Sequence, residues 1–155
     1  QGGTEDGGVS QRILGSFLNW MQDRRGDVFI VATANAIEKL PPEFLRKGRF
    51  DEIFFVDLPD AATRWEIFRI HLAARGQDAD AFDLDALAEQ SDGFTGSEIE
   101  EVVVSGLYTA FSEDSVLTTD DLRREILGTV PLSITMAERV EGLRSWARSR
   151  TVRAN

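Results

Sequence analysis

Hydrophobic residues follow two kinds of pattern along the chain. Two short continuous apolar runs, Val28–Val31 and Ile53–Val56, lie in the first third of the sequence. They are too short for buried helices and are typical of strands that are covered on both faces. Most of the remaining chain spaces its apolar residues at helical intervals. The pattern therefore predicts a piece of α/β structure followed by a helical part.

Capping residues mark the starts of the helices in the second part. Asp60 is placed to cap a helix over 61–75. Thr95, followed three residues later by Glu98, has the capping-box spacing at the start of a longer helix. Further helices are predicted over 84–90 and from Thr118 to Gly128. The apolar face of the helix after Thr95 is assigned to Ile99, Val102, Val103, Leu107, Ala110 and Phe111.

The two ends of the chain are interpreted in the same way. Ser10 is expected to cap a helix over 11–22, after a glycine-rich loop at Gln1–Gly8. Near the other end, Thr135 and Glu138 repeat the capping-box spacing before a last helix. That helix carries an apolar stripe of Met136, Val140, Leu143 and Ala147. The stripe is expected by default to dock on the helical part, and docking on a neighbouring subunit is the alternative.

Composition excludes several functional classes. The chain of 155 residues has no cysteine and one histidine, so disulfides and thiolate metal sites are excluded and a metal site in this chain is not expected. The formal net charge of −10 argues against nucleic-acid binding, which depends on basic surfaces. No apolar run approaches the roughly 20 residues of a membrane-spanning helix.

Three polar residues near the apolar runs are candidates for chemistry. Asn35 follows the first run, at the carboxyl end of a predicted strand, where ligands bind in open α/β sheets. Arg46 and Arg49 flank Gly48, where a short helix is predicted to stop. Two guanidiniums three residues apart can donate hydrogen bonds to one anionic centre. Taken singly, such an asparagine is usually a turn residue, and such arginines are usually solvated.

In their order and spacing, these residues form a longer pattern. The segments VATAN, LPPEFLRKGRFD and IFFVDLPD together resemble the second region of homology of AAA+ ATPases. Within that family, the segment LRKGRFDEIFFVDLP most resembles a branch of AAA proteins known from cyanobacteria and plastids. The resemblance implies that Asn35 is sensor 1, which orients the attacking water. It also implies that Arg46 and Arg49 are arginine fingers that reach the γ-phosphate of ATP in a neighbouring subunit.

The resemblance also assigns nucleotide-binding residues to the helical part. In EIFRIH, His71 corresponds to a histidine that lies beside adenine or ribose. In GFTGSEI, Gly96 and Ser97 correspond to sensor 2 positions at a helix N-terminus, whose positive dipole end suits an anion. Many AAA+ proteins place an arginine at sensor 2, where this chain has Ser97. The alternative interpretation of His71 is a partly buried helix residue without a ligand. For Gly96 and Ser97, the alternative is an ordinary capped helix that contacts no nucleotide.

The fold class that follows is α/β plus all-α, the C-terminal part of a P-loop NTPase (AAA+) parallel sheet followed by a small helical-bundle lid. The expected boundaries are 1–59 for the α/β part, 60–130 for the lid and 131–155 for a C-terminal helical extension. The sequence contains neither GxxxxGK[ST] nor an apolar run that ends in Asp-Glu. We therefore expect a fragment of a longer ATPase that is inactive by itself.

The functional hypothesis is ATP hydrolysis by a homo-oligomeric ring, expected to be a hexamer, that remodels or unfolds macromolecules. ATP would be the cofactor, and Mg²⁺ would be held by residues outside this chain. The hypothesis fits a cytoplasmic or plastid stromal protein whose partners are its own copies, with no nucleic acid and no membrane. The alternative is a non-catalytic protein-interaction module that uses the lid and the C-terminal helix.

Overall fold

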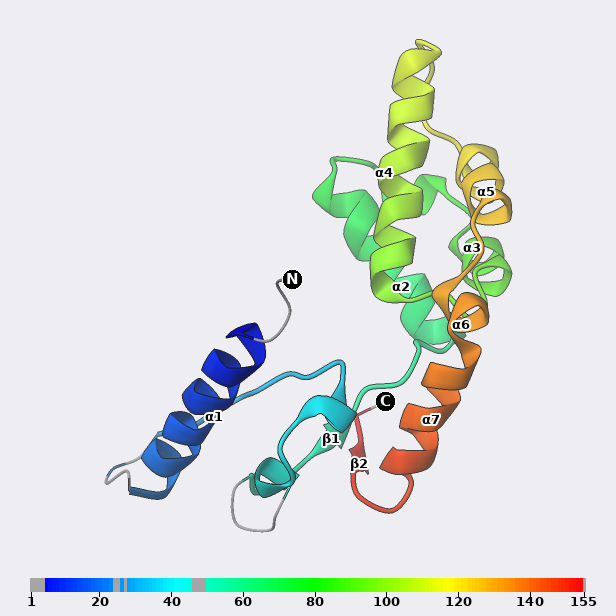
Figure 1. The fold of residues 1–155 in the computed structure, drawn as a ribbon. Helices are drawn as coiled ribbons and strands as arrows, with labels where there is room; N and C mark the ends of the chain where they lie inside the picture. The colour runs from blue at the N-terminus through cyan, green and yellow to red at the C-terminus, as the bar shows by residue number, and fades with distance from the viewer. Residues whose placement is uncertain (1–4, 24–25, 27, 46–49, 155) are drawn as a thin grey trace. The chain divides into compact units, whose positions relative to one another are not determined.

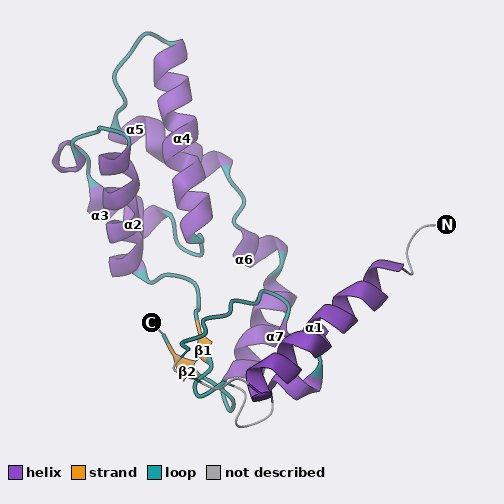
Figure 2. Ribbon diagram, turned by 90° about the vertical axis from the view of Figure 1, so that its left-hand side faces the viewer, coloured by secondary structure: helices purple, strands orange, loops and turns teal. Residues whose placement is uncertain are grey.

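The chain divides into two compact units, residues 1–53 and 54–155 (Figure 1). The computed structural model describes residues 5–23, 26, 28–45 and 50–154. In those ranges the structure is mainly helical, and its strands are the short β1 and β2, drawn in orange in Figure 2. No helix among the described residues is long and apolar enough to cross a membrane.

The first unit contains helix α1 (Glu5–Asp23) and two short 3-10 helices, Ile37–Lys39 and Pro42–Leu45. Phe44 is its buried aromatic residue and stacks on Phe17 of α1, with 6.3 Å between ring centroids. The helix begins before Ser10, so the predicted cap there is wrong, and so is the loop predicted over residues 5–8. The glycines at positions 7 and 8 destabilise a helix by only about 1 kcal/mol each. Helix formation is cooperative, so the helix that continues to Asp23 offsets this cost.

The strand predicted at Val28–Val31 is absent, because residues 28–34 have no regular secondary structure. The side chains of Phe29 and Val31 are 93% and 76% exposed. A strand that is buried on both faces needs neighbouring strands to pair its backbone and further elements to cover its side chains. The described residues of the first unit contain no strand with which this segment could pair.

The second unit is built on a bundle of four helices, which Figure 1 shows in green and yellow: α2 (Ala61–Ala74), α3 (Leu84–Gln90), α4 (Gly96–Ser112) and α5 (Thr119–Gly128). Helix α2 packs against α3 and α4, and α4 packs against α5. Burying one large apolar side chain contributes roughly 1.5–3 kcal/mol. The core consists of Phe68, Leu72, Leu84, Leu87, Phe94, Ile99, Val102, Val103, Ala110, Leu117, Leu122 and Ile126.

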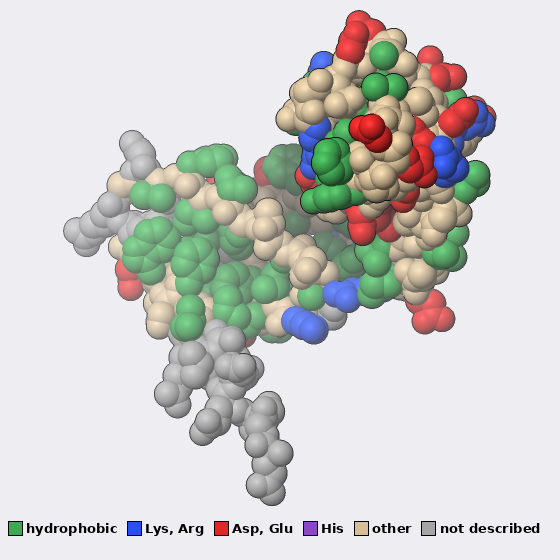
Figure 3. All heavy atoms as spheres, turned by 90° about the horizontal axis from the view of Figure 1, so that it is seen from above, with side chains coloured by type: hydrophobic (Ala, Val, Ile, Leu, Met, Phe, Trp, Pro, Cys, Tyr) green, Lys and Arg blue, Asp and Glu red, His purple; other side chains and the backbone are tan. Residues whose placement is uncertain are grey.

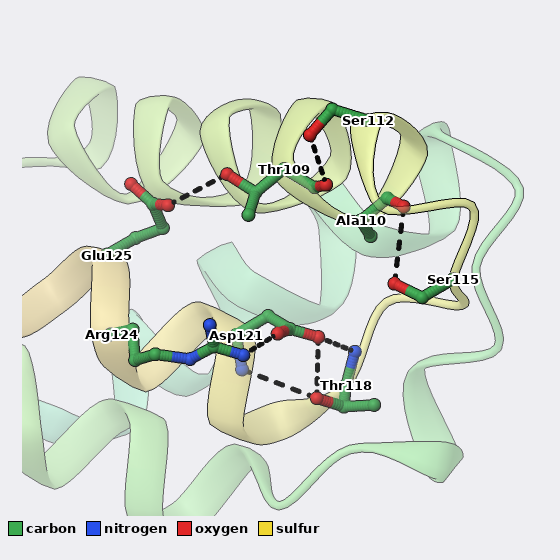
Figure 4. A network of polar contacts seen from close by, with 8 residues as sticks. All are labelled: Thr109, Ala110, Ser112, Ser115, Thr118, Asp121, Arg124 and Glu125. Carbon is green, nitrogen blue, oxygen red and sulfur yellow. Dashed lines mark hydrogen bonds and ion pairs between the residues drawn. The ribbon is translucent and has the colours of Figure 1, made fainter.

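Side-chain caps begin these helices where the sequence predicts them. The Asp60 carboxylate accepts a hydrogen bond of 2.8 Å from a backbone amide in the first turn of α2. Thr95 and Glu98 form a complete capping box at the start of α4, and Thr118 and Asp121 form a second one at the start of α5 (Figure 4). The cap predictions at Asp60, Thr95 and Thr118 are therefore confirmed.

The packed face of α4 differs from the predicted one at its end. Phe111 is 85% exposed, although its apolar character suggested burial. It lies one residue beyond the buried Ala110, so it is turned by about 100° from the core face. Gly106 is buried instead, and a Cβ atom there would lie 2.9 Å from Leu122 of α5. Glycine at this position allows α4 and α5 to approach closely.

The C-terminal segment contains α6 (Leu132–Thr135), α7 (Ala137–Ala147) and β2 (Val152–Arg153). The predicted capping box at Thr135 and Glu138 is wrong, because Thr135 is the last residue of α6 and its hydroxyl donates to the Leu132 carbonyl at 3.3 Å. Thr135 is therefore part of the short helix α6 that follows Pro131, and it does not cap α7.

The C-terminal segment returns to the start of the second unit. β2 pairs in parallel with β1 (Phe54–Phe55), with Phe54 opposite Val152. Asp57, directly after this strand region, accepts two hydrogen bonds of 2.9 and 3.0 Å from Nε of Arg144 in α7. The second apolar run thus forms a strand, but a shorter one than predicted.

Candidate functional site

The predicted site residues are divided between the two units. Asn35 belongs to the first unit, whereas His71, Gly96 and Ser97 belong to the second. The arginines predicted as fingers at positions 46 and 49 lie outside the described residues. The side chain of Asn35 is exposed, at a bend that follows the irregular segment 28–34. An exposed amide at that place is accessible to a ligand.

The other three candidates lie where α2 packs against α4. Ile67 of α2 lies beside Gly96, at which a Cβ atom would be 3.7 Å from the Ile67 Cδ1 atom. One turn further along both helices, Nδ1 of His71 lies 3.7 Å from Oε1 of Glu100. We call this line of contacts, from Ile67–Gly96 to His71–Glu100, the α2–α4 seam. It brings His71 and the first turn of α4 into one part of the molecule.

His71 is held by a polar network within the seam. Its side chain is 24% exposed, and Arg75 Nη1 lies 3.2 Å from both its Nδ1 atom and its carbonyl oxygen. Arg75 Nη2 donates a hydrogen bond of 2.7 Å to Oε1 of Glu100. This hydrogen bond from Arg75 is the main cause that lowers the pKa of the Glu100 carboxyl from its ordinary value. The imidazole is therefore fixed in place while part of it remains accessible.

The first turn of α4 presents backbone amides beside this network. The capping box engages the amides of Thr95 and Glu98, at 2.7 and 3.3 Å, and leaves those of Gly96 and Ser97 outside the cap. First-turn amides without an intrahelical partner can bind anions. Ser97 is exposed and Gly96 is half-buried. The space around Gly96 would accept a Cβ atom, so packing does not require glycine there.

Sequence reasoning did not single out two residues of the seam. Arg75 lies four residues after His71, a spacing that places both side chains on one face of a helix. That spacing was the available signal for Arg75. Glu100 lies 25 residues further on and comes from another helix. No local pattern could have paired it with Arg75.

Sequence reasoning also missed a buried arginine at the start of the bundle. Arg64 is 5% exposed, and it donates to the carbonyl oxygens of Ala88 at 2.9 Å and Pro59 at 2.8 Å. It joins α2 to α3 and to the segment before α2. Its signal is the spacing of four residues to Phe68 and then to Leu72, which places all three on the core face of α2.

Acidic side chains are spread over the helical unit, as the red atoms in Figure 3 show. Several of them are engaged by arginines, including Glu66, Glu100 and Asp121. Among the residues that the structure describes, no three His, Cys, Asp or Glu side chains are grouped so that they could hold a metal ion.

Two family models match this chain. The model for the ATPase family associated with various cellular activities (AAA) matches residues 1–58, and the model for the AAA+ lid domain matches residues 81–123. The chain belongs to the AAA+ ATPase family. It therefore carries the C-terminal part of a P-loop NTPase module with its helical lid, as the sequence predicted. Compared with that prediction, the described part of the chain contains little sheet.

Known AAA+ proteins share long stretches with the chain. The uncharacterized AAA domain-containing protein ycf46 of Pyropia yezoensis is 45% identical over 143 residues, 92% of this chain and 29% of that protein. Its counterpart in Guillardia theta is 42% identical over 149 residues, 96% of this chain and 29% of that protein. The proteasome-activating nucleotidase of Aeropyrum pernix is 36% identical over 105 residues, 67% of this chain and 25% of that protein.

These similarities confirm the branch of the family that the sequence pattern resembles, the cyanobacterial and plastid type. The chain spans about three tenths of the length of its ycf46 relatives.

Proposed function

We propose that the intact AAA+ protein binds and hydrolyses ATP as a homo-oligomeric ring, a hexamer, and uses hydrolysis to remodel or unfold macromolecules. The observation that carries the proposal is the α2–α4 seam, where His71 lies near the exposed first turn of α4 in a chain of this family. Relatives named proteasome-activating nucleotidase and ATP-dependent zinc metalloprotease support a nucleotide-dependent activity.

The seam supplies the groups that would hold ATP. His71 would contact the adenine or ribose, and the amides of Gly96 and Ser97 would bind nearby polar atoms of the nucleotide. These groups fit such a ligand. The half-buried imidazole of His71 lies about one helical turn from the backbone amides of Gly96 and Ser97, which take no part in the capping box. Mg²⁺ would be held by residues outside this chain, where it would neutralise charge on the phosphates.

The first unit would supply the groups that act in hydrolysis. Asn35 would orient the attacking water. Arg46 and Arg49 would stabilise charge on the γ-phosphate bound by the neighbouring subunit, an effect worth roughly 10³–10⁵ in rate for arginine fingers. In this proposal the α/β part comprises residues 1–59, the lid 60–130 and the C-terminal extension 131–155. The protein would work in the cytoplasm or the plastid stroma, and its ycf46 relatives favour a plastid origin.

Steady-state ATP turnover of the full-length protein tests this proposal. Arg49→Ala and Asn35→Ala should each reduce turnover by more than about 10²-fold, because each removes stabilisation of the transition state and not of bound ATP. ADP affinity should stay within about threefold of wild type. Arg69→Ala is the matched control, because Arg69 is an exposed arginine that pairs with Glu66 on the surface of α2. Unchanged turnover in Arg49→Ala would remove the arginine-finger assignment.

A non-catalytic interaction module is the second candidate. It is favoured by apolar side chains that the lid exposes near the ends of α4 and α5, namely Phe111, Val116 and Leu127, which are 85%, 81% and 82% exposed. The upstream sequence of the parent reading frame distinguishes the candidates. A GxxxxGK[ST] loop and an apolar run ending in Asp-Glu favour the ATPase, and their absence favours the module.

A further inference from the structure

The Arg75 side chain connects His71 to Glu100 within the α2–α4 seam. Its Nη1 atom lies 3.2 Å from Nδ1 of His71, and its Nη2 atom donates to the Glu100 carboxylate at 2.7 Å. A guanidinium has only donors, so the ring nitrogen that it meets must accept. A neutral imidazole that accepts at Nδ1 carries its proton on Nε2. The contact therefore determines which ring nitrogen is the donor.

We propose that Arg75, held by Glu100, is a positioning residue that fixes His71 in the Nε2–H tautomer. The ring then presents a hydrogen-bond donor to the nucleotide, and the ring nitrogens of adenine and the oxygens of ribose are acceptors that match it. The inference rests on the proposed function for its statement that His71 meets a nucleotide. The tautomer itself follows from contacts between residues of this chain.

Arg75 is well placed to hold its position. It is the C-cap residue of α2 and is 25% exposed. Both terminal nitrogens of its guanidinium are engaged, Nη1 by His71 and Nη2 by Glu100. The planar guanidinium loses less freedom per hydrogen bond than a lysine amine would. Glu100 comes from α4, so the network forms only when the two helices are packed.

Loss of Arg75 would move the ring proton of His71 from Nε2 toward Nδ1. Oε1 of Glu100 already lies 3.7 Å from Nδ1 of His71. Without the intervening guanidinium, this carboxylate is the nearby acceptor, and it favours a proton on Nδ1. Nε2 would then be an acceptor facing other acceptors on the ligand. The predicted consequence is a change of tautomer, and a merely structural role for Arg75 would not produce it.

The test uses the full-length protein and compares Arg75→Met with the control Arg69→Met. Two-bond ¹H–¹⁵N correlation spectra report which ring nitrogen of a histidine is protonated, and His71→Gln identifies the His71 signals by their loss. Calorimetric titration with ADP gives the affinity of each variant. Wild type and Arg69→Met should show the Nε2–H tautomer, and Arg75→Met should show a mixture enriched in Nδ1–H. Its ADP affinity should fall by about 2- to 10-fold, the range for one hydrogen bond.

Two further variants separate positioning from folding. Arg75→Lys keeps a donor and should restore the Nε2–H tautomer at least partly. Glu100→Gln keeps an acceptor for Arg75 and removes the carboxylate charge, so it should retain that tautomer as well. An unchanged tautomer in Arg75→Met would overturn the proposal, and so would an Nδ1–H tautomer in wild type.

The claim that His71 contacts the nucleotide can be disproved independently of the claim that Arg75 sets its tautomer. If Arg75→Met changes the tautomer while His71→Gln binds ADP as wild type does, the assignment of His71 to the nucleotide is wrong, and with it the functional part of this inference. If His71→Gln weakens ADP binding and the added substitution Arg75→Met weakens it no further, the two residues act as one unit, as proposed.

Discussion

The α2–α5 bundle and the segment 28–34 are both rich in apolar residues, but only the bundle buries them. Phe68 and Leu72 are fully buried, whereas Phe29 is 93% and Val31 is 76% exposed. A helix satisfies its own backbone hydrogen bonds, so helices need from one another only cover for their apolar faces. A strand depends on neighbours for both its backbone and its side chains. In the described residues, the bundle therefore buries its apolar faces, whereas segment 28–34 has no strand of its own unit to pair with.

The largest expected effect tests this contrast directly. Leu72→Ala removes a fully buried side chain from the bundle and should lower the free energy of unfolding of this chain by about 2–5 kcal/mol. Phe29→Ala removes a larger side chain that is 93% exposed, and the change should stay within about 0.5 kcal/mol. Urea denaturation followed by circular dichroism measures both. Equal losses would show that segment 28–34 is packed as well as the bundle is.

The buried arginine of the bundle should give the next largest effect. Arg64→Met removes the hydrogen bonds that the buried guanidinium donates to the carbonyls of Ala88 and Pro59, at a cost of about 1–3 kcal/mol in unfolding free energy. Arg69→Met removes an arginine of the same helix that is 44% exposed and paired with Glu66, and exposed pairs contribute about 0–1 kcal/mol. Thermal and urea denaturation compare the two variants. A smaller loss for Arg64→Met than for Arg69→Met would contradict the role assigned to the buried side chain.

Loss of a helix cap should have a smaller effect on stability. Thr95–Glu98 and Thr135–Glu138 share the capping-box spacing, but only the first pair forms a cap. Thr95→Ala removes the hydroxyl that caps α4 and should lower the free energy of unfolding by about 1 kcal/mol. Thr135→Ala changes a residue that ends α6 and caps no helix, so its effect should stay within about 0.5 kcal/mol. The same denaturation experiment measures both. A cost for Thr135→Ala as large as that for Thr95→Ala would restore the predicted cap.

The pH dependence of stability should show the smallest effect. Hydrogen bonds from Thr118, and the nearby charge of Arg124, hold the pKa of the buried Asp121 carboxyl below its ordinary value of 3.8. A lowered pKa means that this carboxylate stabilises the fold fully above its ordinary value. The contribution is lost as the pH falls through the lower, folded-state pKa.

Asp121→Asn should therefore reduce the loss of stability between neutral pH and about pH 3. Asp120→Asn is the control, because the side chain of Asp120 is 83% exposed. Urea denaturation at a series of pH values measures the difference. Parallel acid profiles for wild type and Asp121→Asn would show that the capping carboxylate does not contribute to the acid transition.

Local patterns predicted the lid well because its signals lie within a few residues. The caps at Asp60, Thr95 and Thr118 each depend on a side chain and an amide three residues later, and all three form. The helix predicted over 84–90 has those bounds in the structure. The pattern at Thr135 and Glu138 has the same spacing but fails, because the turn that follows Pro131 already uses Thr135.

Contacts between distant segments could not be predicted from the sequence. The pairing of Phe54 with Val152 and the hydrogen bond between Arg75 and Glu100 both join residues that no local pattern connects. The same holds for the polar contact between Thr109 and Glu125, which links α4 to α5 at 3.2 Å (Figure 4). For the candidate site, the sequence supplied His71, Gly96 and Ser97, and the structure added the residues that hold the histidine. The roles of all of these residues stay predictions.

Hydrogen–deuterium exchange of the full-length protein, with and without saturating ADP, tests most directly the claim that the α2–α4 seam binds nucleotide. We expect ADP to slow exchange in the first turn of α4, at Gly96 and Ser97, and around His71, because bound groups exclude water from these amides. Exchange in α5 serves as the internal control and should change little. If ADP binds and leaves the seam unprotected, nucleotide binding lies elsewhere in the protein, and the assignment of this site is wrong.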